Sequence, residues 1–227
     1  MPTSFEAFYR SGGAAQWERG KADVVRQVAD VLMGLSPQSR ILDFGCGTGW
    51  AAPLLTRTGA RYLGVDPSPE GIAIAERDHA GTGIHFHRMS IGEPLEGALA
   101  RSRFTHVFAL DTLHFVPDIE SALASIRDSL EPGGLLVTIS HLYRESRLAD
   151  RVIDFVTREH GYAHLLSGIQ WCILFDRNGY TDVRRYRFFD RQPFDPALYA
   201  GQPDEAIELA REIYEREGAL VVTGRRP

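Results

Sequence analysis

The chain has 227 residues, a length typical of one domain with additions. Apolar residues make up 44% and charged residues 24%, which indicates a folded protein with a sizeable core. The formal net charge of −5 leaves no broad basic field, so we expect no nucleic-acid partner. The sequence shows no signal-peptide pattern and no apolar run near the ~20 residues of a membrane span, so we expect a cytoplasmic protein without a membrane partner.

Cysteine and histidine spacing gives no sign of a metal site. Cys46 and Cys172 lie far apart in unlike surroundings, so neither a disulfide framework nor a metal-binding spacing follows. His85 and His87 share one face of a predicted strand, but two histidines without a third ligand do not make a metal centre. We therefore expect no bound metal.

Short apolar runs alternate with helical patterns along the chain, which is typical of βαβ units around a parallel sheet. An N-terminal arm over residues 1–20 precedes a helix over 21–35. The strands are predicted, in order, at 41–44, 62–66, 84–89, 105–110, 135–140, 183–189 and 219–223. The other helices are predicted at 50–57, 69–78, from 117 to a stop at 132–134, 147–160, 169–178 and 204–217. The pattern predicts one α/β domain over 1–227, a doubly wound, mostly parallel sheet of seven strands with a helical substrate-binding insertion at 141–182.

A glycine-rich turn after the first strand carries the strongest functional signal. Residues 43–49 read Asp-Phe-Gly-Cys-Gly-Thr-Gly. Glycines there allow a sharp turn and the close approach of a ligand, and the N–H groups that open the next helix can hold an anion. A dinucleotide fingerprint needs its third glycine one residue later, where Trp50 stands, and Asp43 suits a ligand with an ammonium group. The turn therefore favours a ligand with an amino-acid end over a dinucleotide.

Asp66 ends the second predicted strand, about twenty residues beyond the turn. A carboxylate in this place can accept both hydroxyls of a ribose, whereas the alternative for Asp66-Pro67 is a simple turn. The position of Asp66 beside the glycine-rich turn favours ribose binding.

Residues 43–49 resemble the first motif of the class I S-adenosylmethionine-dependent methyltransferases, and residues 65–68 (Val-Asp-Pro-Ser) resemble the second. Looser matches lie at 104–116 and 130–136, and the resemblance runs in register from about residue 38 to 140. Gly179-Tyr180 and residues 221–224 extend it toward the C-terminus. The sequence is most similar to the small-molecule branch. The resemblance implies a last strand that is antiparallel.

The same resemblance implies the residues that bind S-adenosylmethionine. Asp43 would approach the amino group of the cofactor and Asp66 its ribose hydroxyls, while neighbouring backbone lines the methionine and adenine parts. The implied set is Asp43, Gly45, Cys46, Gly47, Asp66, Pro67, Ser68, Ser90, Ile91 and Leu110. Such families commonly carry an acidic residue where Ser90 stands, so the adenine contact is left open between Ser90 and Glu93.

The acceptor side is predicted from residues that follow strands four and five. A sulfonium is already a strong electrophile, so the enzyme mainly aligns the acceptor, and a general base helps where the acceptor is a neutral hydroxyl. His114 is the expected base because histidine titrates near working pH, and a packed or surface histidine is the alternative. The expected substrate-binding residues are Tyr9, Trp17, His141, Tyr143 and Trp171, although the two arm residues equally suit simple anchoring and Trp171 a core position.

The sequence predicts methyl transfer from S-adenosylmethionine to an O, N or C atom of a small organic molecule. A non-catalytic cofactor-binding partner of a methyltransferase is the alternative from another class, and an NAD-dependent oxidoreductase is disfavoured by the glycine spacing. A homodimer and a monomer both remain open.

Overall fold

The structure is a computed structural model that describes residues 18, 20–89, 103–201 and 204–227. Within these residues, seven strands form one sheet in the order β3-β2-β1-β4-β5-β7-β6. Strands β1 to β5 pair in parallel, and β7 runs antiparallel to both of its neighbours, as the sequence predicts. The strands are β1 Arg40–Phe44, β2 Arg61–Asp66, β3 His85–Arg88, β4 Phe104–Leu110, β5 Leu130–Ser140, β6 Thr181–Phe188 and β7 Ala219–Arg225.

The helices follow the predicted alternation with the strands. The α-helices are α3 Ala22–Val28, α4 Ala52–Thr56, α5 Pro69–Asp78, α7 Ile119–Ser129, α8 Ala149–His160, α9 Gly168–Arg177 and α10 Asp204–Glu212. Two of them run on into π-helical turns, α3 into η1 Ala29–Met33 and α10 into η4 Ile213–Glu217, and the short 3-10 turns are η2 Leu113–Phe115 and η3 Pro196–Tyr199. A capping box opens α9, since the Ser167 and Gln170 side chains accept from each other's backbone N–H groups.

Strand β5 begins five residues earlier than the sequence indicates. Helix α7 ends at Ser129 and β5 starts at Leu130, so the predicted stop residues 132–134 lie inside the strand. The register between β4 and β5 shifts there, from Phe104 opposite Leu130 to His106 opposite Leu135. A bulge of this kind absorbs the Pro-Gly-Gly residues that a regular strand would not hold.

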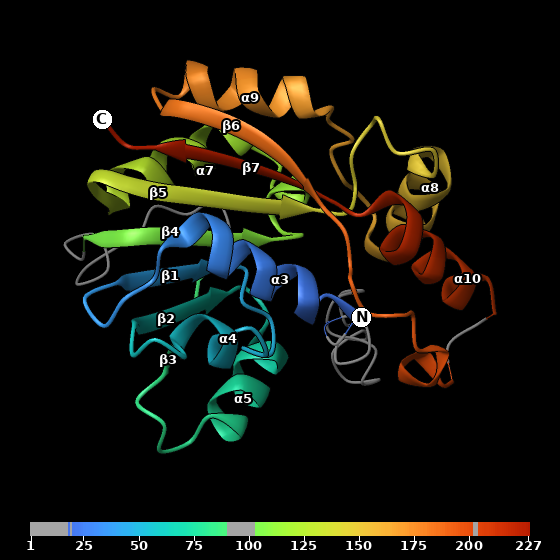
Figure 1. Cartoon of the computed structure of the whole chain (residues 1–227), viewed down its shortest axis with the longest axis horizontal. Coiled ribbons are helices and arrows are strands. Elements are labelled where there is room, and N and C mark those ends of the chain that lie inside the picture. Colours follow the sequence, from blue (N-terminus) through green and yellow to red (C-terminus); the bar gives the residue numbers. More distant parts are fainter. Residues whose placement is uncertain (1–17, 19, 90–102, 202–203) are drawn as a thin grey trace.

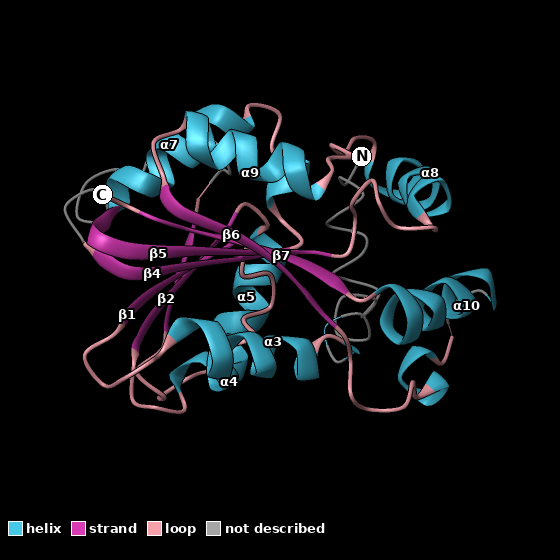
Figure 2. Cartoon of the chain, turned by 45° about the horizontal axis from the view of Figure 1, so that its top comes forward, coloured by secondary structure: helices cyan, strands magenta, loops and turns pink. Residues whose placement is uncertain are grey.

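Helices cover both faces of the sheet (Figure 2). Helices α3 and α4 pack on one face, around Val25, Leu55 and the apolar residues of β7. Helices α7 and α9 pack on the other, around Leu123 and Trp171. The prediction of a doubly wound α/β fold is therefore confirmed.

A third apolar cluster lies apart from the two faces of the sheet. It joins η3, α10 and η4 with α8 through Tyr199, Leu209, Tyr214 and Val152. Figure 1 shows α8 and α10 together beyond the end where the parallel strands finish. We call η3, α10, η4 and α8 the cap. The sequence places α8 and α9 in one insertion, but α8 packs in the cap whereas α9 packs on the sheet. In the described part of the chain, no helix combines the length and apolar character that crossing a membrane requires.

Candidate active site

The glycine-rich turn stands at the carboxyl end of β1, where open parallel sheets hold their ligands. Gly45, Gly47 and Gly49 have φ values of +81°, +55° and +72°, a left-handed region that side chains with a Cβ rarely adopt. A Cβ on Gly45 would also lie 2.1 Å from the Thr112 Oγ1 atom, which follows β4. The turn therefore needs glycine both for its backbone shape and for its close packing on the end of the next strand.

Hydrogen bonds join the turn to the end of β2. The N–H groups of Gly45 and Cys46 donate to the Val65 carbonyl at 2.8 and 3.0 Å. The Gly47 N–H donates to Asp66 Oδ2 at 2.9 Å, and the Ser68 N–H donates to Asp66 Oδ1 at 2.9 Å. The two parts of the predicted cofactor site thus hold each other, and the Asp66 carboxylate is fixed in one orientation.

Asp43 is a second buried carboxylate beside Asp66. Its side chain is 2% exposed in the folded chain, and its Oδ2 accepts a 2.6 Å hydrogen bond from the Tyr62 hydroxyl. Burial and, to a lesser degree, the nearby charge of Asp66 raise the pKa of Asp43 to about 7, against the opposing effect of the Tyr62 hydrogen bond. Burial likewise raises the pKa of Asp66, although its two backbone N–H donors oppose the rise.

The donor and acceptor set fits an adenosyl amino acid. A carboxylate offers about four acceptor positions, so Asp66 keeps lone pairs for two ribose hydroxyls beyond the two backbone bonds. In the described chain neither Asp43 nor Asp66 has a Lys, Arg or His partner, and a ligand ammonium would supply the missing cation. These two carboxylates and the glycine turn would hold S-adenosylmethionine, which carries the transferable methyl group on its sulfonium.

The remaining predicted cofactor residues have local roles as well. Cys46 is 4% exposed in the turn, and burial raises the pKa of its thiol well above the usual value. Ser68 is the N-cap of α5 and accepts from the Gly71 N–H at 3.1 Å, while Pro67 beside it is exposed. The Leu110 carbonyl accepts a 2.9 Å bond from the Thr112 hydroxyl. Ser90, Ile91 and Glu93 lie outside the described residues.

Polar residues also gather after β4 and β5, on the expected acceptor side. The Asp111 carboxylate accepts from the His141 backbone N–H through Oδ1 and contacts the His141 Nδ1 atom through Oδ2, both at 2.8 Å. Lys21 at the start of α3 places its Nζ atom 2.8 Å from the same Oδ2. Burial raises the pKa of Asp111, but Lys21 and His141 outweigh it and hold that pKa well below its usual range.

The other predicted acceptor residues are buried. His114 is 3% exposed in η2, with its Nδ1 atom 3.4 Å from the Ser140 hydroxyl. Tyr143 donates to the Glu217 carbonyl at 2.9 Å, and burial raises its pKa to about 12. Trp171 of α9 is 1% exposed in the core, and its Nε1 atom has no hydrogen-bond partner in the described part of the chain. Tyr9 and Trp17 lie outside the described residues.

Four residues of this edge are absent from the sequence prediction. Tyr62, Lys21 and Asp111 hold the carboxylates and the histidine described above, and Glu18 accepts a 2.8 Å hydrogen bond from the Thr48 hydroxyl in the glycine turn. Lys21 is the only lysine of the chain, and Asp111 directly follows a predicted strand. Both features could have marked these residues as site candidates from the sequence. Nothing in the sequence indicates the contact of Tyr62 with Asp43.

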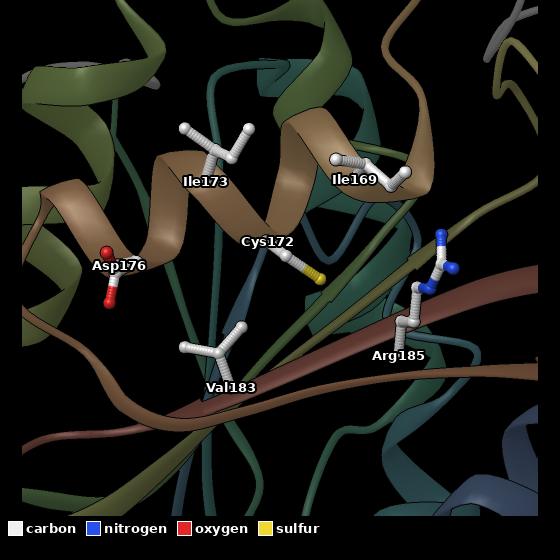
Figure 3. A pocket seen from close by; sticks show the side chains of 6 residues that line it. All are labelled: Ile169, Cys172, Ile173, Asp176, Val183 and Arg185. Carbon is white, nitrogen blue, oxygen red and sulfur yellow. The ribbon is translucent and has the colours of Figure 1, made fainter.

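A separate depression lies between α9 and β6, away from this edge (Figure 3). Its lining residues are Ile169, Cys172, Ile173, Asp176, Val183 and Arg185. It opens to solvent, and its isoleucines Ile169 and Ile173 are exposed. Among the residues that the structure describes, no group of three or more His, Cys, Asp or Glu side chains is placed to hold a metal ion.

A protein-family model described as a methyltransferase domain matches residues 16–185, which include the glycine turn, Asp66 and the Asp111–His141 pair. The chain belongs to the class I S-adenosylmethionine-dependent methyltransferases. Methyl transfer from S-adenosylmethionine is the activity of this family, and the expected cofactor is confirmed.

Curated relatives support this family membership. The ubiquinone biosynthesis O-methyltransferase of Methylocella silvestris is 38% identical over 98 residues, covering 43% of this chain and 38% of the relative. That of Rhodopseudomonas palustris strain BisB18 is 30% identical over 155 residues, covering 67% of this chain and 56% of the relative. The chain thus spans about half the length of the curated relatives it matches.

Solved methyltransferase structures share the fold. A chain of the Haloferax volcanii complex between the Trm112 methyltransferase activator and a methyltransferase superposes with a TM-score of 0.79 at 21% identity, over 100% of this chain and 99% of that one. The geranyl diphosphate C-methyltransferase of Streptomyces coelicolor A3(2), solved with S-adenosyl-L-homocysteine, gives 0.68 at 15% identity, over 90% of this chain and 80% of that one. At these identities the likeness concerns the fold alone.

Proposed function

We propose that this methyltransferase transfers the methyl group of S-adenosylmethionine to an oxygen, nitrogen or carbon atom of a small organic molecule, with oxygen as the favoured acceptor. The observation that carries the proposal is the division of one sheet edge into two polar halves. One half holds the buried carboxylates Asp43 and Asp66, and the other holds Asp111 with Lys21 and His141. A cofactor bound in the first half would face an acceptor in the second.

The cap supports a small acceptor. Tyr199, Leu209 and Tyr214 are buried in an apolar cluster with α8, and this cluster holds the cap together beyond the end of the parallel strands, where a small molecule would be covered. The net charge of the chain is −5, which does not favour a nucleic-acid backbone as the acceptor. The curated relatives are named as O-methyltransferases, which favours an oxygen acceptor.

Within this proposal the cofactor residues keep the roles that the family resemblance implies. Asp66 would accept the ribose hydroxyls and Asp43 would approach the amino group, while the turn lines the methionine part. His114 and His141 are the two candidates for a base at the acceptor, because each follows one of the two central strands.

Calorimetric titration with S-adenosylhomocysteine, and with NAD as a parallel control, tests the cofactor half. We expect micromolar binding of S-adenosylhomocysteine and none of NAD. Incubation of the protein with S-adenosylmethionine and a panel of small phenols, amines and carbon acids, followed by mass spectrometry, tests the acceptor half. Methylation of none of the panel, by protein that binds S-adenosylhomocysteine, would contradict the small-molecule assignment.

A further inference from the structure

One ring nitrogen of His141 contacts Asp111, and the other has no partner among the residues that the structure describes. The ring is 7% exposed, and its Nδ1 atom lies 2.8 Å from Asp111 Oδ2. Its Nε2 atom is buried and has no hydrogen-bond partner within residues 18, 20–89, 103–201 and 204–227. A buried polar atom without a partner costs about 1–3 kcal/mol, so it is retained where a ligand or a function requires it.

Asp111 fixes both the place and the tautomer of this ring. A carboxylate only accepts hydrogen bonds, so the proton of a neutral His141 ring must sit on Nδ1 when it faces Asp111. The Nε2 atom then carries a lone pair. Asp111 also accepts from the His141 backbone N–H at 2.8 Å, so the carboxylate holds the residue at two points.

Asp111 has an unusual backbone. Its φ is +47°, in the left-handed region that residues other than glycine adopt at a cost of roughly 1–2 kcal/mol. This conformation lies between Leu110, which ends β4, and Thr112, whose Oγ1 atom lies 3.4 Å from the Gly45 carbonyl of the glycine turn. The strained residue thus stands one position from the contact with the turn that would hold the cofactor.

A chain of polar contacts connects the turn with His141. Thr48 of the turn donates to Glu18, and the Lys21 backbone N–H donates to the Glu18 carbonyl at 3.1 Å. The Lys21 ammonium then contacts Asp111, which binds His141. These contacts place His141 and the turn on one continuous network at the same edge of the sheet.

The other charged or titratable groups near this pair come from four elements. Lys21 approaches from the start of α3, and His114 of η2 lies near Asp111. Asp190, after β6, acts on His141 through its charge. The Tyr214 ring of η4 packs edge-on against the His141 ring, with 5.4 Å between centroids. Lys21 keeps Asp111 ionised, so a proton on His141 would face a carboxylate that is already charged.

We propose that His141 is the general base of methyl transfer and that Asp111 is its positioning residue; this inference rests on the proposed function. The acceptor hydroxyl donates its proton to the Nε2 atom of His141 while its oxygen bonds to the methyl carbon. The bond between the methyl carbon and the sulfonium breaks, and its electron pair stays on the sulfur of S-adenosylhomocysteine. Asp111 stabilises the imidazolium that results, and the proton leaves to solvent after product release. The pair selects acceptors with an ionisable O–H or N–H over those that need no proton removed.

The experiment combines a spectroscopic and a kinetic readout on the full chain bound to S-adenosylhomocysteine. Nitrogen-15 NMR of the histidine rings reports which nitrogen of His141 carries the proton, and the His141→Gln spectrum assigns the signal. We expect the Nδ1–H tautomer in the parent protein and a mixture of tautomers in Asp111→Asn. With a phenolic acceptor, we expect kcat to fall by ~10²–10⁴-fold in His141→Gln, while S-adenosylhomocysteine affinity stays within about threefold.

His85→Gln, at an exposed position of β3, is the matched control and should retain the parent rate. In the parent protein, kcat should rise with pH as a single group loses its proton. This rise should be absent from the pH profile of His141→Gln. An Nε2–H tautomer in the parent protein, or a His141→Gln rate within threefold of it, would overturn the pair as the base. A large loss in His114→Gln with none in His141→Gln would assign the base to His114. Failure to bind S-adenosylhomocysteine at all would instead overturn the proposed function, and the NMR tautomer still decides the arrangement of the pair.

Discussion

The two halves of the candidate site treat buried carboxylates in opposite ways. Asp43 and Asp66 have pKa values raised by burial and lie without a cationic partner in the described chain. Asp111, on the acceptor half, has its pKa held well below the usual range because Lys21 and His141 outweigh burial. In the described chain the carboxylates of the first half therefore lack a cation, whereas Lys21 balances the charge of Asp111 in the second half.

This difference matches the partners that each half would meet. S-adenosylmethionine brings its own ammonium and hydroxyls, so the protein supplies acceptors and leaves them without cations. A neutral acceptor molecule brings no charge, so a base on that side must be oriented and stabilised by the protein itself. Each half can be perturbed separately.

The pH dependence of stability should report the raised pKa of Asp43. The carboxyl ionises near pH 4 when the chain is unfolded and near 7 when it is folded, so its contribution is full below pH 4 and is lost as the pH rises through 7. The difference amounts to at most about 4 kcal/mol between pH 4 and pH 8. Asp43→Asn keeps the shape and removes the charge, and should flatten this dependence.

Urea unfolding at pH 5 and at pH 8 measures the effect on Asp43. Asp182→Asn is the control, because Asp182 is half exposed and pairs with Arg184 far from the site. An Asp43→Asn protein that loses as much stability between the two pH values as the parent would contradict the burial of an ionisable Asp43.

Removing the cation from the acceptor half should destabilise the fold by about 2 kcal/mol. The Lys21 and Asp111 side chains are 16% and 15% exposed, which places Lys21→Met between the 3–5 kcal/mol of a broken buried pair and the near-zero effect of a surface pair. The lowered pKa of Asp111 gives stability that is present above pH 4 and lost as the pH falls below it. The parent and Lys21→Met should thus differ most above pH 5 and converge in acid.

Because Lys21 is the only lysine in the sequence, its contact with Asp111 can be followed by a single NMR signal. Lysine-selective nitrogen-15 labelling gives one side-chain ammonium signal, whose position should change when Asp111→Asn removes the carboxylate charge. Arg184→Met breaks an exposed pair and should change the unfolding free energy by less than about 0.5 kcal/mol. An equal effect of Lys21→Met and Arg184→Met would remove the distinction between the two halves.

Replacing the ribose acceptor should weaken the cofactor half alone. Asp66→Ala should lower the affinity for S-adenosylhomocysteine more than tenfold, which is about 1.4 kcal/mol, because the ribose hydroxyls and the N–H groups of Gly47 and Ser68 lose their acceptor. The nitrogen-15 signal of His141 should stay unchanged in the same variant. Unchanged affinity would refute the role of Asp66.

The sequence predicted the structure correctly where interactions between residues close in sequence determine it. Short apolar runs between helical patterns placed the seven strands within about five residues of their observed bounds. The start of β5 was wrong by five residues, since Pro132 and Gly133 are absorbed by a bulge against β4 rather than ending the strand. Helix α9 was assigned to a substrate insertion, but its apolar face pairs with the sheet, and only tertiary packing distinguishes the two.

The sequence by itself determined the family, the cofactor and the two carboxylates that flank the glycine turn, because motif spacing along one strand–turn–helix unit is local. Tertiary structure alone decided which groups meet across the ends of β1, β2, β4 and β5. The Tyr62 hydroxyl donates to Asp43, and the Lys21 ammonium contacts Asp111, although the residues of each pair lie far apart in the sequence. Our proposal of His141 as the base, where the sequence predicts His114, has the same origin: the carboxylate that orients His141 lies 30 positions away, and adjacent parallel strands bring the two residues to one edge.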